Sequence, residues 1–393
     1  MQLSTTKSLN REKSIRIFCV LYLFSYVSFS MAMTSITPFL TSLGYDIVQR
    51  GTILSGYALT TILFQMFFGI LADRFQTIRK VLIASLIIFG ITSAILFVQS
   101  EMNYIFHFII NALSIGLLNT CCGLMDTWVL SSGEEPKAKL SFIKAFGSIG
   151  WAISSIIASI LVLHFSYAYL SATIVIITIF VLINVIRISD IKKINHTKKI
   201  QMSDLAGLFK DRKYALLVFI LFLLYSIIVA NNGIVIDKML ELGATNTQIS
   251  YKWTLQSLLE IPTYLFGYRI LRRYNHFNLL QLSAFVITIQ FVLYSFTSNV
   301  IIMILLNLLQ MFTTPLVLIT SKILIFNLSD TRLKSSSQLV ALSIFTGVSS
   351  LLMPTVASAL STIVGINKTL FCVALLGVFA SILIPKLKQI CEI

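Results

Sequence analysis

Hydrophobic residues form long blocks along this chain, and polar residues collect in the short intervals between them. A helix of about 20 apolar residues crosses the hydrocarbon of a bilayer, where lipid offers no partner to an unpaired backbone amide. The pattern therefore predicts an all-α integral membrane fold. The expected membrane spans are twelve, at 17–42, 48–73, 79–99, 103–130, 138–164, 166–188, 214–240, 246–270, 277–297, 299–327, 334–363 and 365–387.

The longest polar interval, DIKKINHTKKIQMSDLAGLFKDRK at 190–213, divides the chain into two sets of six spans. It predicts an N-terminal half at 1–189, a cytoplasmic linker at 190–213 and a C-terminal half at 214–393. The two halves also contain similar segments at corresponding places. GILADRF at 69–75 is answered by GYRILRRY at 267–274, and EEPKAK at 134–139 by SDTRLK at 329–334. Repeated halves of this kind are typical of secondary transporters, and they predict pseudo-symmetry.

The composition agrees, because 57% of residues are hydrophobic and 11% are charged, against about 25% charged in soluble domains. The net charge of +15 would suggest nucleic acid in a soluble protein, but here Lys and Arg mark cytoplasmic loops. A cytoplasmic N-terminus places 24 of the 30 basic residues on the inner side. We expect a monomer in the cell membrane with both termini cytoplasmic, contacts with the lipid bilayer, and no nucleic-acid partner, metal or cofactor.

The segment GILADRFQTIRK at 69–80 resembles the loop 2–3 signature of the major facilitator superfamily. The chain has Gln76 where the family has glycine. The resemblance implies a twelve-helix fold and a gating role for the matching residues. The alternative is that these charges only set the orientation of the chain in the membrane. The matching residues are Gly69, Asp73, Arg74, Arg79 and Lys80.

Two charged residues lie inside apolar blocks that flank a short turn: Asp126 precedes the turn and Lys144 follows it. Each sits about five residues inside its helix, so the two share a depth of roughly 8 Å. An isolated charge there costs about 3 kcal/mol or more, and pairing across an antiparallel hairpin removes much of that cost. The spacing predicts an ion pair. It could be structural glue, but buried ionisable groups in membranes are mostly functional.

The polar and aromatic neighbours of this pair favour a binding site. Asn119 lies seven residues before Asp126, while Ser148 and Trp151 follow Lys144 at helical spacing. Charged groups exchange hydrogen bonds with hydroxyls, and an aromatic plate covers the apolar face of a sugar ring.

Residues 119–151 resemble the lactose-permease-like oligosaccharide:proton symporters, in which an acidic residue is followed by a basic residue and FG-x-x-GW. The matching elements are Asp126, Lys144 and FGSIGW at 146–151. The resemblance implies that Asp126 and Lys144 bind sugar hydroxyls and that Trp151 stacks on the ring. This chain departs from the family by having lysine in place of arginine, and lysine cannot form a bidentate fork.

The C-terminal half lacks the proton-binding residues of those symporters. Alignment places Gln310 and Thr313 at the histidine and glutamate positions and Gln290 at the arginine. The remaining candidate is Glu260, near the middle of the span at 246–270. Hydrocarbon favours the neutral form of a carboxyl group, which suits reversible protonation, so we expect Glu260, with Asp126, to couple protons. A permanently protonated glutamic acid is the structural alternative.

Further polar and aromatic residues are weaker candidates. Asp237 and Lys238 are expected to form a pair at the outer rim, and Tyr22 to serve in packing. Asn231, Asn232 and Gln256 carry amides, which commonly join helices, so a binding role and a packing role both stay open for them. The candidates for the binding site are Asn231, Asn232, Gln256 and Tyr26.

The sequence thus predicts a symporter that imports a sugar or oligosaccharide with protons by alternating access. A nucleoside or other small-solute permease on the same fold is the first alternative, and a drug-efflux antiporter the second, although 147–151 reads GSIGW and lacks the antiporters' glycine–proline signature. An enzyme is not expected, because no nucleophile–base or metal-ligand spacing occurs.

Overall fold

The computed structural model describes residues 2–74, 77–133, 135–136, 139–188, 190, 210–328 and 340–392, and these fall into two compact units. The first unit comprises residues 1–195 with 253–265, and the second comprises 196–252 with 266–393. Helices run through all twelve predicted spans within the described residues, and ten of them are long and apolar enough to cross a membrane. The predicted boundaries of the halves stay a prediction, and most of the predicted linker lies outside the described residues.

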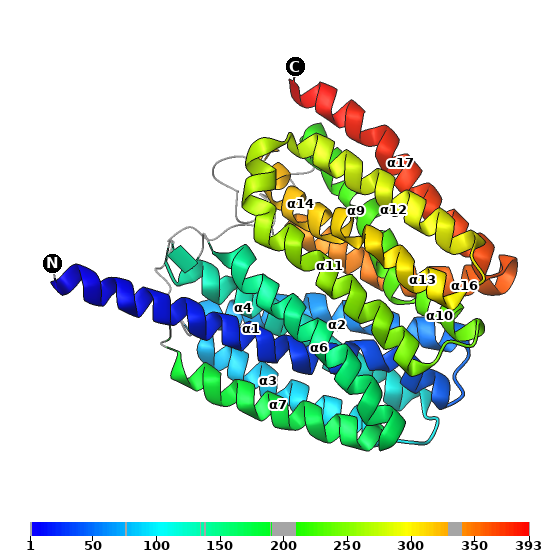
Figure 1. Ribbon diagram of the computed structural model, residues 1–393, viewed down its shortest axis with the longest axis horizontal. Helices are drawn as coiled ribbons and strands as arrows, with labels where there is room; N and C mark the ends of the chain where they lie inside the picture. Colours follow the sequence, from blue (N-terminus) through cyan, green and yellow to red (C-terminus); the bar gives the residue numbers. More distant parts are fainter. Residues whose placement is uncertain are drawn as a thin grey trace. The chain divides into compact units, whose positions relative to one another are not determined.

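Among its described residues, the first unit contains six long helices and one stretch of a seventh. Helix α1 packs along α6, α2 along α4, and α3 between α4 and α7 (Figure 1). The stretch Trp253–Leu265 of α11 (Asn246–Arg273) belongs to the same unit. The six helices are α1 (Gln2–Ser42), α2 (Ile47–Arg74), α3 (Arg79–Val98), α4 (Tyr104–Ser131), α6 (Leu140–His164) and α7 (Tyr167–Arg187).

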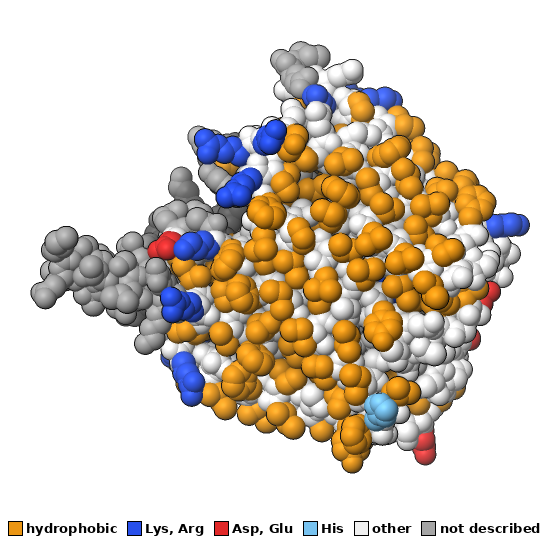
Figure 2. Space-filling view, in the orientation of Figure 1, with side chains coloured by type: hydrophobic (Ala, Val, Ile, Leu, Met, Phe, Trp, Pro, Cys, Tyr) orange, Lys and Arg blue, Asp and Glu red, His pale blue; other side chains and the backbone are white. Residues whose placement is uncertain are grey.

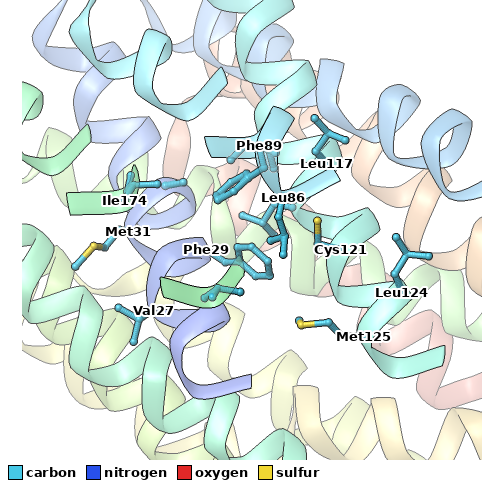
Figure 3. Close-up of a cluster of buried hydrophobic side chains, with 14 of the residues drawn as sticks. Val27, Phe29, Met31, Leu86, Phe89, Leu117, Cys121, Leu124, Met125 and Ile174 are labelled. Atoms are coloured by element: carbon cyan, nitrogen blue, oxygen red, sulfur yellow. The ribbon is translucent and has the colours of Figure 1, made fainter. Parts of the chain in front are cut away.

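An apolar core fixes these helices against one another. Side chains from α1, α3, α4 and α7 interdigitate there, among them Phe29, Phe89 and Met125 (Figure 3). The outward faces carry exposed isoleucine, leucine and phenylalanine side chains, and Figure 2 shows such apolar side chains spread over the visible surface of both units. Apolar residues on both the inside and the outside are what a helix in lipid requires.

The second unit packs α12 along α17, α9 against α16 and α17, and α14 against α12 and α9. One predicted span, 299–327, is divided: an α-helix of six residues passes into a 3₁₀ helix of seven and then into a further α-helix. The elements are α9 (Arg212–Asn232), α10 (Ile234–Glu241), α11, α12 (His276–Phe296), α13 (Val300–Leu305), η1 (Leu306–Phe312), α14 (Thr314–Leu328), the π-helix η2 (Ser343–Val348), α16 (Ser349–Val364) and α17 (Ile366–Glu392).

One turn is repeated between the two sequence halves. Gly44 after α1 and Gly243 after α10 both have positive φ, at 92° and 80°, a conformation that glycine adopts without steric cost. Asp46 and Thr245 then each accept a hydrogen bond from the amide of a glutamine three residues on, and that glutamine bonds back to the cap residue's amide. Equivalent caps at equivalent places support the internal duplication that the sequence echoes predict.

Candidate functional site

Asp126 and Lys144 form the predicted ion pair. Asp126 lies five residues before the end of α4 and Lys144 four residues after the start of α6, so the hairpin brings them level. Lys144 Nζ lies 2.6 Å from Asp126 Oδ2, and the two side chains are 26% and 25% exposed. The pairing is confirmed, and both side chains keep part of their surface exposed.

The second carboxylate oxygen has a partner that the sequence analysis missed. The Tyr22 hydroxyl on α1 donates to Asp126 Oδ1 over 2.6 Å, although Tyr22 was expected only to pack. The available signal was the spacing of Tyr22 and Tyr26, one helical turn apart. Such spacing is common in packed helices, so it could not distinguish the two roles.

An aromatic layer borders the ion pair. The Tyr26 ring stacks on Tyr22 with centroids 5.8 Å apart and planes 13° apart, and Trp151 meets Tyr26 edge-on at 6.3 Å. Two glycines of α6 make this possible. A Cβ on Gly147 would lie 3.0 Å from the Tyr26 ring, and one on Gly150 would lie 2.3 Å from the Leu23 carbonyl oxygen. The α1–α6 contact therefore places Tyr26 and Trp151 beside the charges.

The other predicted residues of the first unit are less closely gathered. Asn119 directs its amide to Thr61 of α2 at 3.3 Å. Ser148 lies half-buried on α6 between Lys144 and Trp151. Gln256 and Glu260 both fall in the stretch of α11 that belongs to the first unit, and Glu260 lies at the middle of that helix. The convergence of Asn119 on the ion pair is not observed.

Asn231 and Asn232 form the last turn of α9 in the second unit. The backbone carbonyl of Asn231 accepts a hydrogen bond from Lys252 Nζ at 3.2 Å. A cation at this position satisfies a carbonyl that the helix end leaves open. This contact gives the backbone of Asn231 a structural role at the end of α9. The predicted role of Asn231 in solute binding stays a prediction.

The expected pair of Asp237 and Lys238 stays a prediction, and both side chains are buried where an exposed rim position was expected. Asp237 is 5% exposed and Lys238 2% exposed. Lys238 Nζ donates to the carbonyls of Tyr294 and Ser295 in the last turn of α12. Lys252 is also fully buried. Carbonyls at helix ends attract cations into the protein, which hydropathy alone does not reveal.

The divided span carries the positions aligned with the symporters' proton pair. Gln310 donates to Thr314 at 2.8 Å, and Thr313 lies at the break with φ −108° and ψ −105°. Gln290 of α12 donates to the Tyr294 hydroxyl and to the Leu306 carbonyl, each at 3.2 Å. Amides and hydroxyls therefore satisfy the backbone where the helix changes type, as irregular backbone within a membrane requires.

Of the predicted gating residues, Gly69 and the side chains of Asp73 and Arg74 lie outside what the structure describes. Arg79 donates to the carbonyls of Ile186 at 3.5 Å and Ile188 at 3.3 Å, at the end of α7, while Lys80 is exposed. The carboxylate of Asp190 accepts hydrogen bonds from the Thr77 hydroxyl and the Arg79 amide. The loop between α2 and α3 is thus fastened to the residues that follow α7.

These features define a class: a multi-pass, all-α membrane protein with a charged site inside one compact unit. Residues 15–356 match the family model described as "MFS_1 like family", and the chain belongs to this family of major facilitator transporters. By sequence, no curated protein matches the chain at a significant level.

The structure is similar to crystal structures of the nucleoside transporter NupG. A mutant form of that transporter gives a TM-score of 0.82 and the unmutated form 0.79. In both comparisons the identity is 14%, over 95% of this chain and 99% of that chain. The likeness establishes a shared fold, and it confirms the predicted all-α membrane architecture of twelve helices in two pseudo-symmetric halves.

Proposed function

We propose that this transporter imports a small solute that carries a sugar ring, and that Asp126 and Lys144 bind the hydroxyls of that ring. The observation that carries the proposal is the ion pair itself, 2.6 Å across and about one quarter exposed on each side chain. Lysine offers N–H donors and aspartate offers acceptor oxygens, and a vicinal diol can use both at once. Trp151 and Tyr26 supply an aromatic surface for the apolar face of the ring.

Free sugars or oligosaccharides are the first candidate class, because the order Asp126, Lys144, FGSIGW resembles the oligosaccharide:proton symporters. Nucleosides are the second. They are favoured by the likeness to NupG over nearly the whole chain, and by Gln310 and Thr313 at the positions of the symporters' proton pair. A nucleoside presents a ribose diol to charged groups and a flat base to aromatic rings, so both classes fit the same residues.

In this proposal transport is driven by protons, and Glu260 carries the proton. Glu260 lies at mid-helix in α11, within the same compact unit as Asp126. A carboxyl group at that depth can exist in a neutral and a charged form whose balance changes with its surroundings. Alternating access then exposes this group to each side of the membrane in turn. The remaining parts of the proposal are a location in the cell membrane, cytoplasmic termini and a monomeric state.

The test is the external pH of lightly buffered, anaerobic cells that express the protein, measured as sugars, nucleosides and carboxylates are added in turn. An alkaline shift absent from control cells identifies the solute class and proton symport together. Labelled uptake of each solute is measured in parallel. Uptake without a pH shift would contradict proton coupling, and no uptake of any sugar or nucleoside would contradict the proposed substrate class.

A further inference from the structure

Asp126 is held from two sides by groups of different kinds. Lys144 Nζ meets Oδ2 and the Tyr22 hydroxyl meets Oδ1, both at 2.6 Å. One partner is a cation on a neighbouring helix of the hairpin, and the other is a neutral donor on α1. Hydrogen bonds to an ionised acceptor are shorter and about twice as strong as bonds between neutral groups.

The Tyr22 side chain is fixed in place. It has no exposed surface, and its ring stacks on Tyr26 with the planes 13° apart. Asp126 and Lys144, by contrast, are each about one quarter exposed. A solute can therefore reach the charged pair but not the phenol behind it. Because Tyr22 is already ordered by packing, holding Asp126 costs it little further conformational entropy.

Binding of a diol changes the partners of the charged pair. When Lys144 turns some of its N–H groups to solute hydroxyls, Asp126 loses part of its compensation inside the membrane. The Tyr22 hydrogen bond does not depend on the solute, so Oδ1 of Asp126 keeps its partner when a solute binds. Oδ2 stays directed toward Lys144. Loss of this hydrogen bond would remove the contact that holds Asp126 Oδ1 in place.

We infer that Tyr22 is a positioning residue that orients the Asp126 carboxylate for solute binding, an inference that rests on the proposed function above. Tyr22 acts through Asp126 and does not touch the solute. It differs in this from Tyr26, whose ring borders Trp151.

The test compares Tyr22→Phe with the matched control Tyr45→Phe in purified protein reconstituted into liposomes. Tyr45 is also buried in the first unit, and its hydroxyl bonds His107 Nδ1 at 2.8 Å, near the start of α4 and about 28 Å along the helix from Asp126. Tyr22→Phe is expected to raise the KM for the sugar or nucleoside that the wild type takes up roughly tenfold, with kcat within about twofold. Tyr45→Phe is expected to leave KM unchanged.

A second measurement needs no solute. With aspartate labelled by ¹³C at the carboxyl carbon, the Asp126 resonance is assigned as the one missing from Asp126→Asn. It is expected to shift in Tyr22→Phe and to stay in place in Tyr45→Phe. If Tyr22→Phe does not fold, 3,5-difluorotyrosine at position 22 keeps the ring and strengthens the donor, and the resonance is again expected to shift.

The two failures are distinguishable. If the wild type transports no sugar or nucleoside, the proposed function is wrong, while the carboxyl resonance still decides whether Tyr22 orients Asp126. If the wild type transports such a solute but Tyr22→Phe keeps its KM, or if the Asp126 resonance does not move, the positioning role is wrong. A fall in kcat with unchanged KM would likewise overturn it, because it indicates a structural role.

Discussion

Lys144 and Lys238 both place an ammonium group inside apolar helices, but their surroundings differ. Lys144 pairs with the Asp126 carboxylate and is 26% exposed. Lys238 is 2% exposed and donates to two backbone carbonyls at the end of α12. The first cation faces a carboxylate and is partly exposed. The second completes a helix terminus, where carbonyls carry a partial negative charge.

The partners of a buried charge distinguish a functional from a structural role in a membrane protein. A buried cation bound to helix-end carbonyls has partners that cannot dissociate or titrate, so it cannot exchange them for a solute without breaking the helix end. A carboxylate partner is a side chain that can rotate. We therefore expect mutations at the Asp126–Lys144 pair to change transport, and mutations at Lys238 to change stability.

The largest effect is expected for Asp126→Asn. Removing the charge leaves Lys144 without its ionised partner and removes an acceptor for solute hydroxyls, so saturable uptake should fall by more than about a hundredfold. The control is Asp46→Asn, because asparagine caps a helix as well as aspartate does. Uptake per molecule of protein in the membrane is the measurement, and near-normal uptake by Asp126→Asn would remove the pair from the site.

Glu260→Gln is expected to abolish uphill accumulation while exchange of labelled for unlabelled solute continues. Glutamine keeps the size and hydrogen bonding of glutamic acid but carries no exchangeable charge. Accumulation ratio and exchange are measured in the same vesicles, with the exposed Glu101→Gln as control. A Glu260→Gln protein that still concentrates its solute would exclude Glu260 as the proton carrier.

Lys238→Met tests the structural role of the second cation. Methionine retains the apolar stem but leaves the Tyr294 and Ser295 carbonyls without their donor, which should lower the free energy of unfolding by about 1–3 kcal/mol. Uptake per folded molecule should not change. Thermal unfolding in detergent measures the first effect, and the exposed Lys368→Met is the control. Loss of uptake in a fully folded Lys238→Met protein would show that Lys238 also acts in transport.

The smallest effect is expected for Lys144→Arg. Arginine keeps the positive charge and adds a planar fork, which the resembling symporters use at this position. The KM should change by no more than about threefold, because the ion pair with Asp126 survives. Initial rates over a range of solute concentrations give the KM. If Lys144→Arg lost as much uptake as Asp126→Asn, the compact ammonium group itself would be required.

The membrane spans and the Asp126–Lys144 pair could both be predicted from the sequence. The spans follow from length and hydropathy, because a helix in hydrocarbon needs about 20 apolar residues. The pairing of Asp126 with Lys144 follows from equal depth on two helices joined by a short turn. Both deductions depend on positions close along the chain, where helical geometry alone fixes the distances.

The contacts between residues far apart in the chain could not be predicted from the sequence. Tyr22 reaches Asp126 across 104 positions, because glycines at 147 and 150 let α1 lie close against α6. Lys238 turns inward because α12 ends beside it, and the span at 299–327 changes helix type where Gln290 of α12 can satisfy its backbone. Such contacts depend on how helices pack, and packing is set by the shapes of many side chains together, which local patterns do not encode.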